Sequence, residues 1–283
     1  MRIFLFLTVV ITSMGVLVSG HIHWLNKIAL AGETANFSME QSKQKKMEEK
    51  ETTIARLNPV NNDSQSLLDY LKYMALTKEE INISVIGSNG VAGTGASHPL
   101  KTWTALLEKG LREEIPEMKK LNMSVHGYEG YTTADFLTGD RVSNLLSNTP
   151  DLILIELAVM NNYVQSLSVE QTITDIVNLV SSLEKGIPNA KVILLSPNPI
   201  INSKEVNRIG LTYEDYLKES MNIVSKNNWA YINSYDLISK KINGKNAVLA
   251  DYITSNQFHL NDEGYYLWYE VIGEFFKNYS LNN

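Results

Sequence analysis

Short runs of apolar and β-branched residues alternate with longer amphipathic stretches through most of this chain. This alternation constrains the fold more than any other feature, because strand, helix and strand in succession form right-handed βαβ units with parallel strands. We therefore expect an α/β fold, a three-layer α/β/α sandwich with a flavodoxin-like parallel sheet of about five strands. The expected strands lie near residues 81–86, 123–126, 152–157, 191–196 and 229–233. The expected helices lie near residues 64–77, 102–113, 133–146, 169–185, 213–226 and 262–276.

The first sixty residues do not follow this pattern. Residues 1–20 are almost continuously apolar behind Arg2, which predicts a signal peptide or a membrane anchor. We favour the anchor, because the run is just long enough to span a bilayer. Residues 21–60 are polar and charged, and they predict a stalk that is either disordered or a solvated helix. Residues 61–283 are expected to form the folded domain.

The composition of the chain indicates its cellular location and argues against some classes of binding partner. The chain has no cysteine, so it has no disulfide and no thiol nucleophile, and with the apolar start this predicts an exported protein, membrane-anchored at the cell surface or secreted. The net charge of −6 leaves no basic stripe for nucleic acid. No two histidines lie at metal-ligand spacing, so we expect neither a metal nor another cofactor. The membrane is expected to be contacted only through the N-terminal segment.

A glycine-rich loop follows the first expected strand. It reads Gly87-Ser88-Asn89-Gly90 and places small polar residues at the carboxyl edge of a parallel sheet, where sites are found in open α/β folds. A phosphate-binding loop would read GxxxxGK[ST] or GxGxxG, and neither pattern is present. A turn without chemical function is the other alternative.

His259 lies in a loop that leads into the last expected helix. Asn256, three residues earlier, can fold back and bond a ring nitrogen, which would fix the tautomer of a general base. A surface histidine without chemical function is the alternative.

Four blocks within residues 81–277 resemble the SGNH, or GDSL-like, hydrolase superfamily of esterases and acyl transferases. The blocks occur in the family order at residues 87–93, 126–133, 150–162 and 256–264. The resemblance implies the same flavodoxin-like sandwich and the hydrolysis of acyl esters.

The resemblance also implies a role for a residue of each block. Ser88 would be the nucleophile, His259 its general base and Asn256 the third member of the triad. The N–H groups of Ser88 and Gly130 and the carboxamide of Asn161 would form the oxyanion hole.

The first block departs from the family pattern at the nucleophile. The family nucleophile is the last serine of Gly-Asp-Ser, four residues before a glycine. Counted back from Gly93 that position is Asn89, and Ser88 precedes it. Because a carboxamide cannot be activated by loss of a proton at neutral pH, we expect the turn to shift by one residue so that Ser88 attacks.

Two further blocks carry a carboxamide where the family has a carboxylate. Asn256 replaces the usual aspartate, and Asn161-Asn162 replaces Asn-Asp. A neutral third member lowers turnover in a triad, by about 10⁴ in serine proteases, so a slow enzyme is expected if Asn256 fills that place. Asp251 and Asp262 are the alternatives for the carboxylate.

The sequence thus predicts a serine esterase acting on acyl esters, chiefly O-acetyl esters of a surface polysaccharide or peptidoglycan. Acyl transfer to a sugar hydroxyl uses the same acyl-enzyme and stays open. The alternative is a catalytically inactive SGNH-like domain that binds a surface glycan or a partner. A nucleotide-binding domain is disfavoured by the absence of a basic residue in the glycine loop.

Overall fold

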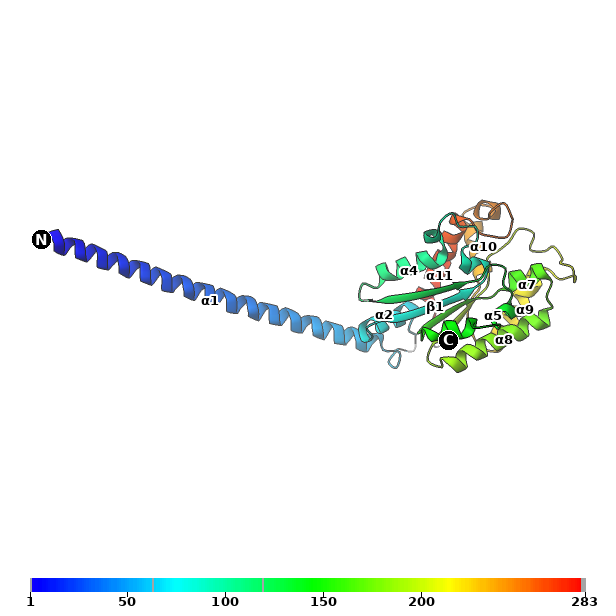
Figure 1. The fold of residues 1–283 in the computed structure, drawn as a ribbon, viewed down its shortest axis with the longest axis horizontal. Coiled ribbons are helices and arrows are strands. Elements are labelled where there is room, and N and C mark those ends of the chain that lie inside the picture. Colours follow the sequence, from blue (N-terminus) through cyan, green and yellow to red (C-terminus); the bar gives the residue numbers. More distant parts are fainter. Residues whose placement is uncertain (1, 63, 119, 281–283) are drawn as a thin grey trace. The chain divides into compact units, whose positions relative to one another are not determined.

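The computed structural model describes residues 2–62, 64–118 and 120–280. The chain divides into two compact units, Met1–Arg56 and Leu57–Asn283. The first unit is formed by α1 (Arg2–Leu57), a continuous helix that is long and apolar enough near its N-terminus to cross a membrane (Figure 1). A signal sequence meets the same criteria, so both expectations for this segment fit the helix. The expected division of the chain at residues 20 and 60 stays a prediction.

Five parallel strands form one sheet in the order β2-β1-β3-β4-β5, which confirms the expected α/β fold. The apolar character of the central strands follows from their burial on both faces. In β1, the successive residues Val85 and Ile86 face opposite sides of the sheet, and both are fully buried. The strands are β1 (Ile81–Gly87), β2 (Leu121–Gly127), β3 (Leu152–Glu156), β4 (Lys191–Leu195) and β5 (Ala230–Ile232).

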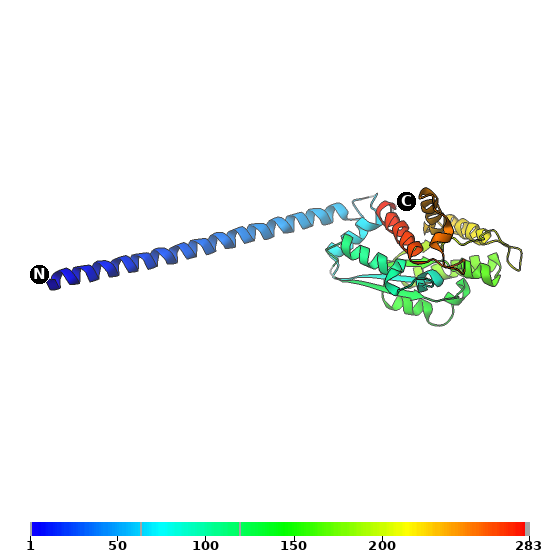
Figure 2. The ribbon, with the colours of Figure 1, turned by 90° about the horizontal axis from the view of Figure 1, so that it is seen from above.

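Helices cover both faces of the sheet (Figures 1 and 2). Apolar side chains of α2, α4, α10 and α11 form one core against Val85, and those of α5 to α9 form the other against Ile86. The helices of this unit are α2 (Leu67–Thr77), α3 (Asn89–Ala92), α4 (Trp103–Glu114), α5 (Thr133–Phe136), α6 (Arg141–Ser147), α7 (Val159–Gln165), α8 (Val169–Gly186), α9 (Tyr213–Lys226), α10 (Ser234–Gly244) and α11 (Asp262–Asn278). Two short 3-10 helices are η1 (Pro99–Lys101) and η2 (Leu249–Tyr252).

Local sequence signals explain where helices begin and end. Thr212 and Asp215 form a capping box at the start of α9. Asn261 accepts a hydrogen bond from the N–H of Gly264 at 3.1 Å and so starts α11 immediately after the His259 loop. The single helix expected over residues 133–146 is wrong. Gly139 has a φ of +61°, a left-handed conformation that interrupts a right-handed helix, and the segment is divided into α5 and α6.

Candidate functional site

The carboxyl ends of β1, β2 and β3 bring three of the expected site residues together. Asn89 is the first residue of α3, Gly130 lies in the loop after β2, and Asn161 lies in the first turn of α7. The N–H of Gly130 donates to Oδ1 of Asn89 at 2.6 Å, and Nδ2 of Asn161 donates to the same oxygen at 3.4 Å. Two of the three donors expected to form an oxyanion hole, those of Gly130 and Asn161, therefore bind a side-chain oxygen of the chain itself.

Further hydrogen bonds hold this group in place. Nδ2 of Asn89 donates back to Oδ1 of Asn161 at 3.2 Å, and Nδ2 of Asn161 also donates to the carbonyl of Tyr131 at 2.7 Å. At the end of α7, Nε2 of Gln165 donates to the carbonyl of Gly130 at 2.9 Å. The φ of Gly130 is +78°, and a Cβ added there would meet nothing within 4 Å. The position thus requires glycine for its backbone conformation and not for lack of space.

Ser88 contacts a different group. Its side chain is fully buried, its Oγ donates to Oε1 of Glu156 at 3.2 Å, and its N–H donates to Oε2 at 3.0 Å. Within residues 2–62, 64–118 and 120–280, no hydrogen bond joins Ser88 to His259. The assignment of Ser88 as the nucleophile therefore stays a prediction.

Glu156, the last residue of β3, is a central residue that the sequence analysis missed. Its side chain is fully buried, and its Oε2 also accepts the N–H of Val91 at 3.1 Å. Burial raises the pKa of Glu156 to about 7, while hydrogen bonds from residues 88–91, the turn that leads from β1 into α3 (the α3 turn), act to lower it. A single glutamate inside the apolar run of residues 152–159 was the available signal, because a charge is rarely buried without a specific partner.

Asn256 shapes the backbone of the His259 loop. Its Oδ1 accepts the N–H groups of Phe258 at 3.0 Å and of His259 at 3.1 Å, with the intervening Gln257 at a φ of +69°. This is a turn built on an asparagine side chain, and the acceptor oxygen is used by backbone donors instead of the imidazole ring. The role of Asn256 as the third triad member stays a prediction.

The His259 ring is half-buried next to the loop that follows α3. A Cβ added at Gly95 would lie 3.2 Å from the Cβ of His259. Burial lowers the pKa of His259, and the negative charge of Glu129 acts in the opposite direction. The carboxylate of Asp262, an alternative third member, instead accepts hydrogen bonds from Ser97 and Lys101, which lower its pKa to about 2.

Asn162 has a structural role beside the site. Its Oδ1 accepts the N–H of Thr133 at 3.0 Å, and its Nδ2 donates to the hydroxyls of Thr133 at 2.7 Å and Thr172 at 2.8 Å. This fully buried side chain therefore joins α7 to α5 and α8.

Residues 85–267 match the GDSL-like lipase/acylhydrolase family. The chain belongs to this family. The match includes the α3 turn, the Gly130 loop, the first turn of α7 and the His259 loop, so it confirms the resemblance found in the sequence. Comparison with curated proteins gave no match.

Solved structures support the same GDSL-like fold. A two-domain esterase active on acetylated mannans is 19% identical with a TM-score of 0.61, and the match covers 75% of this chain and 52% of that one. This chain thus spans about half the length of that esterase. A putative GDSL-like lipase from Parabacteroides merdae is 15% identical (TM-score 0.58; 71% and 97% covered). A catalytic mutant of an acetylxylan esterase from Geobacillus stearothermophilus is also 15% identical (TM-score 0.56; 69% and 94% covered).

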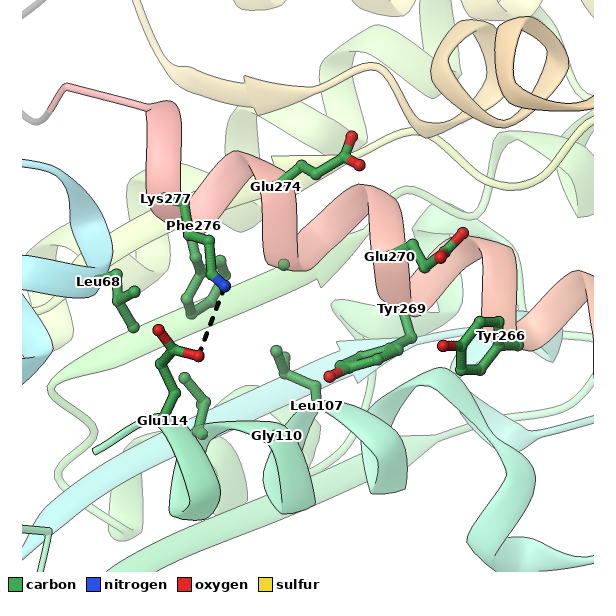
Figure 3. Close-up of a pocket in the computed structure, with 12 residues that line it drawn as sticks. Leu68, Leu107, Gly110, Glu114, Tyr266, Tyr269, Glu270, Glu274, Phe276 and Lys277 are labelled. Carbon is green, nitrogen blue, oxygen red and sulfur yellow. Dashed lines mark hydrogen bonds and ion pairs between the residues drawn. The ribbon is translucent and has the colours of Figure 1, made fainter. Parts of the chain in front are cut away.

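The GDSL-like domain also has a groove between α4 and α11, with a volume of about 290 Å³ (Figure 3). Its lining contains none of the expected site residues. Two of its carboxylates already have partners, since Glu114 lies 3.4 Å from Nζ of Lys277 and Glu274 lies 2.7 Å from Nζ of Lys241. None of the four blocks that resemble the family contributes a residue to the lining of this groove.

Proposed function

We propose that this GDSL-like domain binds an acylated carbohydrate at the cell surface without hydrolysing it. The observation that supports the proposal most strongly is the position of Asn89. Its carboxamide oxygen accepts the hydrogen bonds from Gly130 and Asn161 that would stabilise a tetrahedral intermediate. This alternative from the sequence analysis now has a physical basis.

Two chemical arguments favour binding over catalysis. Asn89 stands at the family's nucleophile position, and a carboxamide has no proton that a histidine can remove at neutral pH. The nearby hydroxyl of Ser88 is fully buried against Glu156, so a substrate carbonyl cannot reach it without movement of the α3 turn.

The proposed ligand class rests on the related structures and on the charge. The similar esterase acts on acetylated mannans, and another similar enzyme is an acetylxylan esterase. A net charge of −6 favours a neutral acetylated sugar over a polyanion. The apolar part of α1, preceded by Arg2, supports an anchor that holds the domain outside the cell.

Serine esterase chemistry through Ser88 is the second candidate function. It is favoured by the Glu156 carboxyl, whose Oε1 lies 3.2 Å from Oγ of Ser88 and whose pKa of about 7 suits a base at neutral pH. His259 would then act on the leaving group, and the α3 turn would have to open.

Hydrolysis of p-nitrophenyl acetate by the full chain in detergent separates the two candidates. For the binding function we expect the wild type to be no faster than the Ser88→Ala and His259→Ala variants. The Asn89→Ser variant should gain about 10²-fold, because it restores a hydroxyl and releases both oxyanion donors. Its gain should disappear when His259→Ala is added.

A second measurement uses a serine-reactive fluorophosphonate, with the modified residue mapped by mass spectrometry. The expected result is no label in the wild type and label at position 89 in the Asn89→Ser variant. Label on Ser88 of the wild type, together with hydrolysis that Ser88→Ala removes, would instead establish the esterase. Binding is then measured calorimetrically with acetylated and deacetylated manno-oligosaccharides, and equal or absent binding of both would contradict the proposed ligand class.

A further inference from the structure

The buried carboxyl of Glu156 is the common partner of the turn that carries Asn89. The N–H of Ser88 at 3.0 Å, the N–H of Val91 at 3.1 Å and the hydroxyl of Ser88 at 3.2 Å all donate to it, and the N–H of Gly90 is a further donor. These donors lie on both sides of Asn89 in the chain. The residues on both sides of Asn89 are therefore held by a group on β3, while the Asn89 carbonyl accepts the N–H groups of Gly93 and Thr94 at the end of this four-residue helix.

The carboxyl has no cationic partner in the described part of the chain. The titratable groups that its charge affects are the hydroxyls of Tyr213 from α9 and Tyr265 from α11: burial raises the pKa of each, and the negative charge of Glu156 raises it further. Neither hydroxyl is positively charged at any pH, so neither offsets the cost of an ionised Glu156.

Glu156 and Ser88 can form a hydrogen bond in either protonation state. When Glu156 is ionised, the Ser88 hydroxyl donates to Oε1. When Glu156 is protonated, its O–H donates to Oγ of Ser88, which then acts as the acceptor. The backbone donors at Oε2 keep an acceptor in both states, but each of their bonds is stronger when the carboxyl is charged.

We propose that Glu156 is the positioning residue for Asn89 and that it reversibly binds a proton which it shares with Ser88. The ionised form holds the α3 turn firmly, and the protonated form holds it less firmly. Since burial raises the pKa of Glu156 to about 7, the change takes place near neutral pH. This inference does not depend on whether the site binds or hydrolyses its ligand.

Amide NMR of the ¹⁵N-labelled full chain in detergent micelles tests the proposal over roughly pH 5.5 to 8.5, a range centred near this pKa. The N–H of Val91 reports on Glu156 directly, and the N–H of Gly130 reports on Asn89. Both signals should titrate together with a midpoint of about 7. In the Glu156→Gln variant, which keeps an acceptor but cannot ionise, both titrations should disappear.

His259→Gln is the matched control, because a histidine near the site titrates in the same range. The Val91 titration should persist in that variant. Ser88→Ala should move the Val91 midpoint upward, since the Ser88 hydroxyl lowers the pKa of Glu156, and this variant also serves if Glu156→Gln fails to fold. A Val91 signal that does not titrate, that titrates in Glu156→Gln or that is unchanged in Ser88→Ala would overturn the proposal.

Discussion

Glu156→Gln should change how the stability of the domain depends on pH. In the unfolded chain Glu156 ionises near its ordinary pKa of 4.5, whereas in the folded domain burial raises that pKa to about 7. Between these values the folded state binds a proton that the unfolded state has lost. The contribution of Glu156 to the free energy of unfolding is therefore fully present below pH 4.5 and declines as the pH rises through the folded pKa.

The magnitude follows from the two pKa values. At 1.36 kcal/mol per pH unit, the interval from 4.5 to about 7 corresponds to a loss of about 3 kcal/mol on going from acid to neutral pH. The glutamine variant has no ionisable group at this position and should not show the loss. Relative to the wild type it should therefore become more stable by about 3 kcal/mol as the pH rises over this range.

Urea unfolding of both proteins, followed by tryptophan fluorescence at several pH values from about 4.5 to 8, measures this difference. Comparison of the two proteins cancels the titration of exposed carboxylates, which is common to both. If the free energies of unfolding of the wild type and the variant differ by the same amount at every pH, the argument that Glu156 is protonated at the start of this range and ionised at its end is refuted.

Three further variants test the side-chain packing, the buried hydrogen bonds and the membrane anchor. Gly90→Ala should destabilise the domain by about 1–3 kcal/mol, because the new Cβ would lie 2.6 Å from the ring of Trp268. The control Gly273→Ala places its Cβ in open space and should be neutral or slightly stabilising in the same urea titration. Asn162→Ala should cost about 2–4 kcal/mol of unfolding free energy, since it removes three buried hydrogen bonds and leaves the N–H of Thr133 without its acceptor. Deletion of residues 2–20 should move the protein from the membrane fraction to the soluble fraction, and an unchanged distribution would contradict an anchor in α1.

The sheet could be predicted from the sequence because burial on both faces leaves a distinct pattern. The run that became β3 is apolar without interruption until Glu156, the run that became β1 contains Asn82 and Ser84 among its apolar residues, and all five expected strands are present in the fold. The helices α3, α7 and α10 were missed. Helices α3 and α7 have only four and seven residues, too few to display a helical period, and all three follow a strand within three residues.

The directions in which the side chains of the α3 turn point could not be predicted from the sequence. Ser88 and Asn89 are adjacent small polar residues between two glycines, so local sequence does not decide which of them faces the sheet edge. The directions are set by Glu156, 68 positions after Ser88 in the chain. Its carboxylate accepts the Ser88 hydroxyl, and the side-chain oxygen of Asn89 instead accepts the N–H of Gly130. Likewise, the spacing from Asn256 to His259 permits a bond to the ring, but the backbone N–H groups of the turn are closer and take the oxygen.

The Asn89 network also limits when the site can form during folding. Asn89 is 41 positions from Gly130 and 72 from Asn161, and these partners follow β2 and β3, the two strands on either side of β1. Contacts this distant along the chain require the closure of long loops, which slows their formation compared with the local turns of the helices. Because the network joins the ends of all three central strands, we expect it to form only once β1 has paired with β2 and β3, late in folding.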